Sequence, residues 1–425
     1  MATLLIRGGR IIDPSQELDR VGDLLLEGRR IVGLDASCPN PDQVLDARGL
    51  IVSPGLIDLH VSLREPGNEE DETIATGTAA ALAGGFTSVA CMSDTRPVVD
   101  NRSEAEFIII QGERAGNAHV FPLGAVTKNN AGQELAEMGQ LVAAGVLAFS
   151  DGRTPIANAE IMRRALQYAS MWDRPIFNRP QVPELVQNGL MHDGFVSTRL
   201  GLRGMPAAAE DIMVARDIAL CELTGGRVHL MCISTAGAID LVRRAKARQL
   251  RISTEVTPHQ FLLTDEVLGT FDSAYKVDPP LRTARHLAAC IQGLQDGTIE
   301  VICSDHQPHS PEKTQRELDL VPFGIAGLET LLPLCITGLV EPGHLTWSQF
   351  LATVTCGPAR VLNLDKGTLR AGADADVTLI NPDVAWTIDP TQFRSKSRNT
   401  PFGGRAVRGR AQIVIVNGQV RYRAD

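Results

Sequence analysis

Residues 55–67 read Gly55-Leu56-Ile57-Asp58-Leu59-His60-Val61-Ser62-Leu63-Arg64-Glu65-Pro66-Gly67, an apolar run that passes into polar and turn-forming residues. Side chains alternate between the two faces of a β-strand, so positions 60 and 62 lie on the same side. Two histidines at such positions would chelate a metal ion where the strand ends. The chain has His60 and then Ser62, and a neutral hydroxyl is a poor zinc ligand compared with an imidazole. The pattern therefore indicates a metal-binding strand end with one ligand missing.

Eight apolar, β-rich runs recur between about residues 54 and 361, with helical patterns between most of them. The runs are 56–62, 88–93, 119–125, 146–151, 175–178, 227–234, 251–257 and 300–306. Eight βα units predict a (β/α)8 TIM-type barrel, whose strands carry their functional residues at one mouth, at their C-terminal ends. The polar residues at those ends are His60, Asp94, Asp151, Asn178, Cys232 and Asp305.

Both ends of the chain read as β-structure. Short alternating runs fill residues 3–35, and further runs occupy residues 375–380 and 413–420, where Asn417-Gly418 is a strong hairpin signal. Neither end is long enough to bury a good core alone. We therefore expect one small composite β-sandwich domain from residues 1–53 and 362–425, beside a barrel domain of residues 54–361.

The composition excludes several classes of function. The formal net charge is −9, which does not favour nucleic acid or an anionic membrane surface as a partner. No apolar run approaches the length of a membrane span, and the N-terminus has no secretory signal pattern. The eight cysteines include no CxxC pair and are typical of buried thiols in a reducing cytosol, so a cytoplasmic location is expected.

Five further segments carry a family resemblance. They are Ala148-Phe149-Ser150-Asp151-Gly152, Thr254-Glu255-Val256-Thr257-Pro258-His259, Lys276-Val277-Asp278-Pro279-Pro280-Leu281-Arg282-Thr283, Ser304-Asp305-His306-Gln307-Pro308-His309 and Ser395-Lys396-Ser397-Arg398-Asn399-Thr400-Pro401-Phe402. Together with residues 55–67, the chain resembles dihydroorotases of the amidohydrolase superfamily over essentially its whole length. The resemblance implies the same barrel with a composite terminal β-domain.

The resemblance also implies a set of metal ligands, half of which are replaced. Active relatives bind one or two zinc ions through histidines, aspartates and, in some, a carboxylated lysine. The residues His60, Asp151 and Asp305 stand at expected ligand positions, and Asp305 would also be the catalytic base. The residues Ser62, Asn178 and Cys232 stand where histidines are expected. We therefore expect either one residual zinc site, at His60, Asp151 and Asp305, or no cofactor at all.

Substrate-binding positions are altered as well. The resemblance assigns binding of an anionic substrate to Arg64, to His309 and to two asparagines, which are Asp94 and Asp278 in this chain. An ionised carboxylate about 4 Å from a substrate carboxylate costs roughly 4 kcal/mol at an effective dielectric near 20. Alternatively, these aspartates pair with arginine; Arg64 either clamps an anion or pairs with Asp94.

Two functions of different classes follow from these losses. The first is a catalytically inactive, dihydroorotase-like protein of pyrimidine biosynthesis, similar to degenerate homologues that assemble with the catalytic chain of aspartate transcarbamoylase. Such a chain would form a hetero-oligomer, or a homodimer when alone. The alternative is an active cyclic amidohydrolase, of dihydroorotase or hydantoinase type, with a single zinc held by His60, Asp151 and Asp305. A third and weaker hypothesis is a sensor that holds an anion with Arg64 and His309.

Overall fold

Eight short parallel strands form a barrel at the centre of the computed structural model, which describes residues 2–424. They are β6 (Leu56–Val61), β7 (Phe86–Cys91), β8 (His119–Pro122), β9 (Phe149–Ser150), β10 (Ile176–Asn178), β13 (Val228–Leu230), β14 (Ile252–Val256) and β15 (Val301–Ile302). Two parallel sheets, β6-β7-β8 and β9-β10-β13-β14-β15, are joined by bridges from Gly124 to Phe149 and from Val61 to His306. The predicted (β/α)8 barrel is confirmed.

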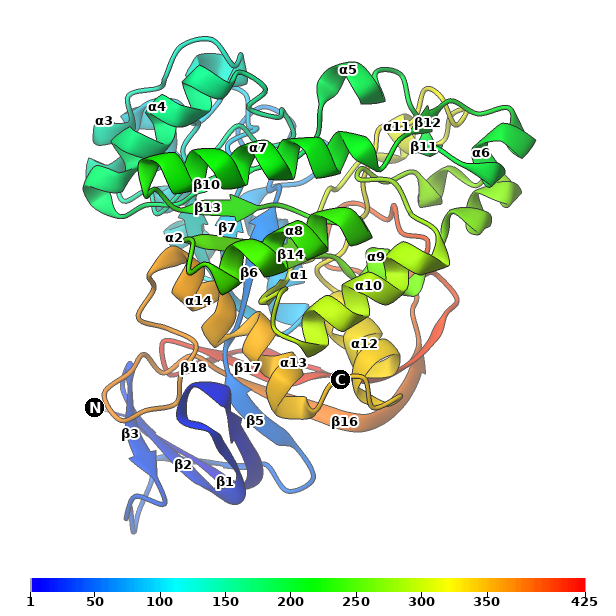
Figure 1. The fold of residues 1–425 in the computed structure, drawn as a ribbon. Helices are drawn as coiled ribbons and strands as arrows, with labels where there is room; N and C mark the ends of the chain where they lie inside the picture. The colour runs from blue at the N-terminus through cyan, green and yellow to red at the C-terminus, as the bar shows by residue number, and fades with distance from the viewer. Residues whose placement is uncertain (1, 425) are drawn as a thin grey trace.

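Helices surround the barrel and bury apolar residues against it. In α4 (Ala159–Ala169) the Asn158 side chain caps the first turn, and Ile161, Met162, Ala165 and Leu166 are buried. The other helices of seven residues or more are α1 (Ile74–Ala83), α2 (Arg102–Ala115), α7 (Ala208–Thr224), α8 (Ala236–Ala247), α10 (Ala284–Gln295), α13 (Trp347–Val354) and α14 (Cys356–Leu362). Figure 1 shows α7 and α8 in front of β13 and β14.

Shorter elements fill the loops around the barrel. The short helices are α3 (Met138–Ala143), α5 (Pro183–Val186), α6 (Phe195–Leu200), α9 (Pro258–Leu262), α11 (Pro311–Thr314) and α12 (Leu331–Cys335), and β11 (Met191–His192) pairs with β12 (Gly204–Met205). The longest helix, α7, has 17 residues. Within residues 2–424, no helix combines the length and the apolar content that crossing a bilayer requires.

Several barrel strands end earlier than the apolar runs predict. The runs 227–234 and 300–306 stop as strands at Leu230 and Ile302. Beyond them, Cys232 and Asp305 adopt left-handed backbone conformations, with φ of 47° and 45°. A non-glycine residue in this region cannot continue a β-strand and costs on the order of 1 kcal/mol or more. The polar ends of the runs therefore belong to the barrel mouth, as loops.

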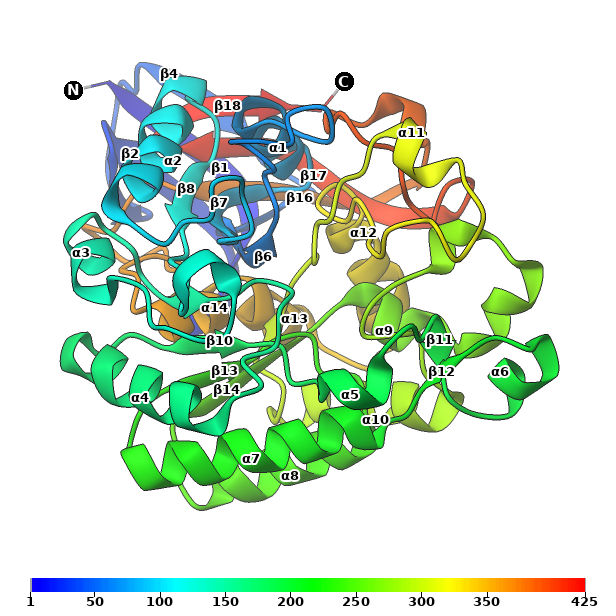
Figure 2. The same ribbon diagram turned by 90° about the horizontal axis from the view of Figure 1, so that it is seen from above.

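The two termini build one β-sandwich domain, as predicted. Its strands are β1 (Thr3–Asp13), β2 (Leu18–Glu27), β3 (Arg30–Leu34), β4 (Gln43–Asp46), β5 (Ile51–Pro54), β16 (Val377–Thr387), β17 (Ala406–Val416) and β18 (Gln419–Arg423). They pair in the order β18-β17-β16-β5-β1-β2-β3, with β4 on β1. The antiparallel pair β5–β16 joins the two ends of the chain. Figures 1 and 2 both show the N-terminal strands beside the C-terminal ones, on one side of the barrel.

Candidate functional site

His60, at the end of β6, is the centre of a buried network at the barrel mouth. Its Nδ1 lies 2.8 Å from Glu255 Oε1, and Glu255 Oε2 lies 3.2 Å from His229 Nε2. Burial alone would lower the pKa of His60, but the neighbouring Cys232, Asp305 and Glu255 raise it well above its ordinary value. Burial opposes ionisation of Glu255 too, yet the two histidines hold the pKa of its carboxyl well below the usual range.

Asp305 continues this network towards the opening. Its Oδ1 lies 3.3 Å from His60 Nε2 and accepts a hydrogen bond from Gln307 Nε2 at 3.1 Å. Gln307 Oε1 accepts in turn from Arg64 Nη2 at 2.7 Å. Asp305, which was predicted to be a catalytic base, therefore contacts the imidazole of His60 and the amide of Gln307, and Gln307 connects it to Arg64.

Asp151 has a different environment from His60 and Asp305. Its carboxylate accepts hydrogen bonds from the backbone N–H of Val126 and of Thr127, each at 2.8 Å, and from Thr127 Oγ1 at 2.5 Å. Burial raises its pKa to about 6, against the opposing effect of these donors. Asp151 therefore anchors the loop that follows β8. Of the expected ligand trio, His60 and Asp305 are in contact, whereas the hydrogen-bond partners of Asp151 are Val126 and Thr127.

Two of the three positions at which an expected histidine is replaced, Ser62 and Asn178, form hydrogen bonds with other parts of the protein. Ser62 Oγ donates weakly to Asp94 at 3.4 Å. Asn178 accepts from the backbone N–H of Ile156 at 3.0 Å and donates to Asp217 Oδ2 at 2.7 Å, so both ends of its amide are occupied. Cys232 Sγ, in contrast, lies within the network, 3.3 Å from His60 Nδ1.

The predicted substrate-binding residues are paired with protein groups. Arg64 Nη1 lies 3.4 Å from Asp94 Oδ2, so the pairing alternative for Arg64 holds in this structure. Asp278 receives Arg179 Nη2 at 2.7 Å. His309 Nε2 lies 3.0 Å from the carbonyl oxygen of Phe323, and burial lowers the pKa of this histidine to about 4. A neutral His309 offers no charge to an anionic ligand.

Sequence reasoning missed two arginines that complete the mouth. Arg179 is buried beside Asp278, and the pKa of Arg153 is lowered by burial and by the nearby charge of Arg179. Arg153 also donates to the carbonyl oxygen of Phe323 at 2.6 Å. A signal for them existed: Arg179 directly follows the β10 run, and Arg153 follows Asp151-Gly152 at the end of β9. Arg64, Arg153 and Arg179 therefore lie close to three carboxylates of the mouth, those of Asp94, Asp278 and Asp305.

The fold and this mouth define an amidohydrolase-type protein. A family described as "Dihydro-orotase-like" matches residues 49–238, and one described as "Amidohydrolase family" matches residues 226–422. The L-hydantoinase of Arthrobacter aurescens superimposes with a TM-score of 0.88 at 21% identity, over 99% of this chain and 96% of that one, which shows the shared fold.

Curated relatives give the particular family. A protein named "Dihydroorotase" from Pelotomaculum thermopropionicum is 50% identical over 418 residues, 98% of each chain. Another of the same name, from Syntrophus aciditrophicus, is 46% identical over 99% of this chain and 100% of its own length. The chain belongs to the dihydroorotase family.

The zinc ligands that this family implies do not fit the observed side chains. Of the six positions, Asp151 and Asn178 have their polar atoms committed to hydrogen bonds with Val126, Thr127, Ile156 and Asp217. Ser62 supplies only a hydroxyl. Of the remaining three, Cys232 Sγ lies 3.3 Å from His60 Nδ1 and Asp305 Oδ1 lies 3.3 Å from His60 Nε2, so they contact different nitrogens of one ring, whereas a catalytic zinc typically has three protein ligands around one point. We therefore derive no hydrolytic step through a metal at this mouth.

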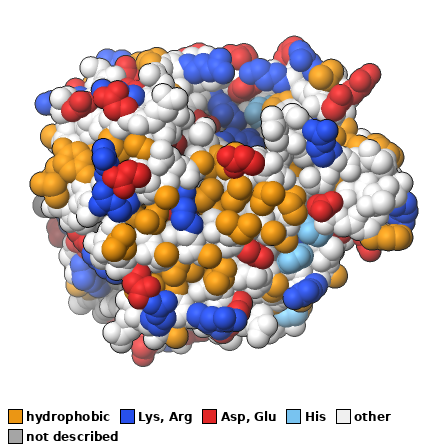
Figure 3. All heavy atoms as spheres, turned by 45° about the horizontal axis from the view of Figure 1, so that its top comes forward, with side chains coloured by type: hydrophobic (Ala, Val, Ile, Leu, Met, Phe, Trp, Pro, Cys, Tyr) orange, Lys and Arg blue, Asp and Glu red, His pale blue; other side chains and the backbone are white. Residues whose placement is uncertain are grey.

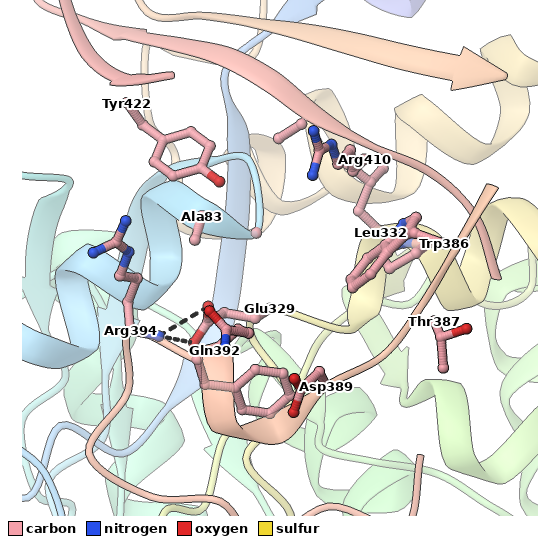
Figure 4. Close-up of a pocket in the computed structure, with 14 residues that line it drawn as sticks. Ala83, Glu329, Leu332, Trp386, Thr387, Asp389, Gln392, Arg394, Arg410 and Tyr422 are labelled. Atoms are coloured by element: carbon pink, nitrogen blue, oxygen red, sulfur yellow. Dashed lines mark hydrogen bonds between the residues drawn. The ribbon is translucent and has the colours of Figure 1, made fainter. Parts of the chain in front are cut away.

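A separate cavity of about 280 Å³ lies away from the mouth, between α12 and strands β16 and β17. Figure 4 shows Glu329 in its wall, where the carboxylate accepts the backbone N–H of Arg394 at 2.8 Å. The Glu329 side chain is partly buried. Burial raises the pKa of Glu329 to about 7, although the backbone donors of Arg394 and Ser395 oppose the shift.

This shift predicts a pH dependence of stability. The raised pKa of Glu329 means that its stabilising contribution is complete below the unfolded pKa, about 4.3, and is lost as the pH rises through about 7. From pH 5 to pH 8, we expect the free energy of unfolding to fall by about 2 kcal/mol more in the unmodified protein than in Glu329→Gln. Urea unfolding at several pH values measures this difference; curves that run parallel would contradict it.

Proposed function

We propose that this chain is a dihydroorotase-family protein that does not hydrolyse dihydroorotate, and that it serves as a non-catalytic partner of the catalytic chain of aspartate transcarbamoylase. The observation that carries the first part is the pairing of Arg64 with Asp94 and of Arg179 with Asp278 at the mouth. An anionic substrate would have to separate these pairs and then meet the freed carboxylates, a cost of several kcal/mol.

The surface of α7 supports the partner role. A helix on the outside of a barrel normally has a polar outer face, whereas a helix that is apolar all round is covered. Five of the six exposed residues of α7 are apolar, namely Ala208, Ile212, Ala215, Ala219 and Leu223; the sixth is Glu222. Ile212 and Leu223 are 54% and 69% exposed. Figure 3 shows apolar side chains gathered on the face that α7 crosses, as expected for a surface that binds another protein.

The test is the mass in solution of this chain, alone and mixed with the aspartate transcarbamoylase catalytic chain of its host. We expect a mixed particle of defined stoichiometry, and a loss of affinity of about 30-fold for Leu223→Glu, because a charge replaces a buried contact. Light scattering on a sizing column measures both. The matched control is Val21→Glu, which changes an equally exposed residue, 68%, in the β-sandwich. Two separate peaks for the unmodified mixture would contradict the partner role.

The names of the relatives favour a second candidate function. Curated proteins up to 50% identical to this chain are named "Dihydroorotase", which supports a working cyclic amidohydrolase more than it supports an inactive partner. In that case one metal would be held by His60, Asp151 and Asp305, and the Asp151 carboxylate would give up its hydrogen bond with Thr127 to bind it. Metal-dependent turnover of dihydroorotate that disappears in Asp305→Ala would establish this function.

A further inference from the structure

Four potential metal ligands converge in the buried network around His60. His60, Cys232, Glu255 and Cys303 each direct one ligand atom to a common point, and these atoms lie within 4.8 Å of one another. All four side chains are buried. We propose that the chain binds a thiophilic divalent cation, zinc above all, at these four residues. This inference does not rest on the proposed function, because a metal here is structural whether or not the chain has a catalytic partner.

The spacing of the ligand atoms fits a tetrahedral ion. Zinc–sulfur bonds of about 2.3 Å and zinc–nitrogen bonds of about 2.0 Å place neighbouring ligand atoms roughly 3.3–3.8 Å apart. Cys232 Sγ lies 3.3 Å from His60 Nδ1 and 3.5 Å from Glu255 Oε1. The distance from His60 Nδ1 to Glu255 Oε1, 2.8 Å, must open by less than 1 Å. Two of these edges therefore already have the length that zinc requires.

The cluster is held by the barrel itself. His60 belongs to β6 and Glu255 to β14, while Cys232 and Cys303 follow β13 and β15 by one or two residues. Strands β13, β14 and β15 are neighbours, and a bridge between Val61 and His306 joins β15 to β6. Donors on two barrel strands and directly after two others are held in position before a metal arrives, which lowers the cost of ordering them.

Neighbouring groups can orient the ligands. With His60 bound through Nδ1, its Nε2–H faces Asp305 Oδ1 at 3.3 Å. Glu255 Oε2 lies 3.2 Å from His229 Nε2, and His229 Nδ1 lies 2.8 Å from Ser253 Oγ. Such carboxylate–histidine contacts commonly fix the ring orientation at metal centres. Binding would release the thiol protons of Cys232 and Cys303 together with any proton on His60 Nδ1.

This site differs from the one that the family implies. The cluster shares His60 and Cys232 with the six family positions and adds Glu255 and Cys303. The other four family positions do not belong to it; they are Ser62, Asp151, Asn178 and Asp305. Four protein ligands leave no open coordination position, which is typical of a structural zinc and not of a catalytic one. The replacement of the expected histidine by Cys232 is then part of an interior thiolate site.

The experiment loads the full-length reduced chain with Co²⁺ and with Zn²⁺ and measures absorption spectra and metal content. We expect about one ion per chain, visible bands of tetrahedral Co²⁺ and a near-ultraviolet thiolate-to-cobalt band. Cys303→Ala and Cys232→Ala should each weaken affinity at least 10-fold. The matched control is Cys335→Ala, another fully buried cysteine, outside the cluster, and it should bind as the unmodified chain does.

Other outcomes would overturn the site. If the unmodified chain gives no thiolate-to-cobalt band, the ion is not bound by cysteine, whatever happens to the variants. Binding that survives Cys303→Ala but is lost in Asp151→Asn would place the metal at the family positions. Circular dichroism of each variant confirms folding, so that a lost band reports on the ligand and not on the fold.

Discussion

Arg179→Met is expected to lower the free energy of unfolding by about 3–5 kcal/mol, because it leaves the Asp278 carboxylate without its cation. Arg179 is 4% exposed, and its Nη2 lies 2.7 Å from Asp278 Oδ2. Although burial opposes ionisation, the pKa of Asp278 is held below its usual value by Arg179 and Arg153. The substitution removes the larger of these two opposing charges, so the cost of burying Asp278 is no longer compensated. Urea unfolding at pH 7 measures the loss.

The double variant Arg179→Met/Asp278→Asn measures how much stability the ion pair as a whole contributes. With both charges removed, most of the lost stability should return, since a buried ion pair contributes little beyond the cost of breaking it. Arg10→Met provides the control at an exposed pair, because Arg10 and Asp19 are 47% and 41% exposed, and its effect should stay below about 1 kcal/mol. If Arg179→Met is as stable as the unmodified protein, Arg179 does not stabilise the Asp278 carboxylate at the mouth.

Turnover is expected to be at least about 1000-fold below that of the Pelotomaculum thermopropionicum dihydroorotase, assayed in parallel with zinc present. Metal-assisted hydrolysis needs a bound metal that activates water and a base that accepts its proton, and each contributes several kcal/mol. In this chain Asp305 contacts His60 and Gln307, while Asp151 is bound by Thr127. The rate is measured in both directions, with dihydroorotate and with carbamoyl-aspartate as the substrate.

Asp305→Ala supplies the control for this assay. Any residual signal should be the same in Asp305→Ala as in the unmodified chain, because the carboxylate has no metal-bound water to act on. A zinc-dependent rate that Asp305→Ala abolishes would support the enzymatic alternative, which the names of the relatives favour. Gln307→Ala, which frees Asp305 Oδ1 from an amide, should leave the rate equally low.

Much of the fold was predictable, because apolar runs and turn signals are local. The eight barrel runs and the β-structured termini follow from alternation and length, and the structure confirms both. The exact strand ends did not follow: nothing local in the run 227–234 indicates that Cys232 takes a left-handed backbone. The contacts that Cys232 makes in this conformation are with His60 and Glu255, which are far away in the sequence.

The sequence predicted which expected ligands of the site are replaced, but not which side chains contact one another there. Ser62, Asn178 and Cys232 are visible as replaced positions in the sequence alone. The pairing of Asp278 with Arg179 needs the proximity of the loops after β10 and η5 (Ser273–Tyr275), which no spacing reveals. Likewise, Cys303 reads as one more apolar residue of its strand until β15 is placed beside β14. Long-range packing, and not residue type, decides which of these groups meet.

X-ray diffraction at the zinc absorption edge, from crystals grown with zinc and dihydroorotate, tests the central claim most directly. The account predicts Arg179 on Asp278 and no anomalous density between His60 Nε2, Asp151 and Asp305, with any bound zinc in the interior at Cys232 and Cys303. An anomalous peak at the mouth, with dihydroorotate beside it and Arg179 displaced, would contradict the account and make this chain a metal-dependent hydrolase.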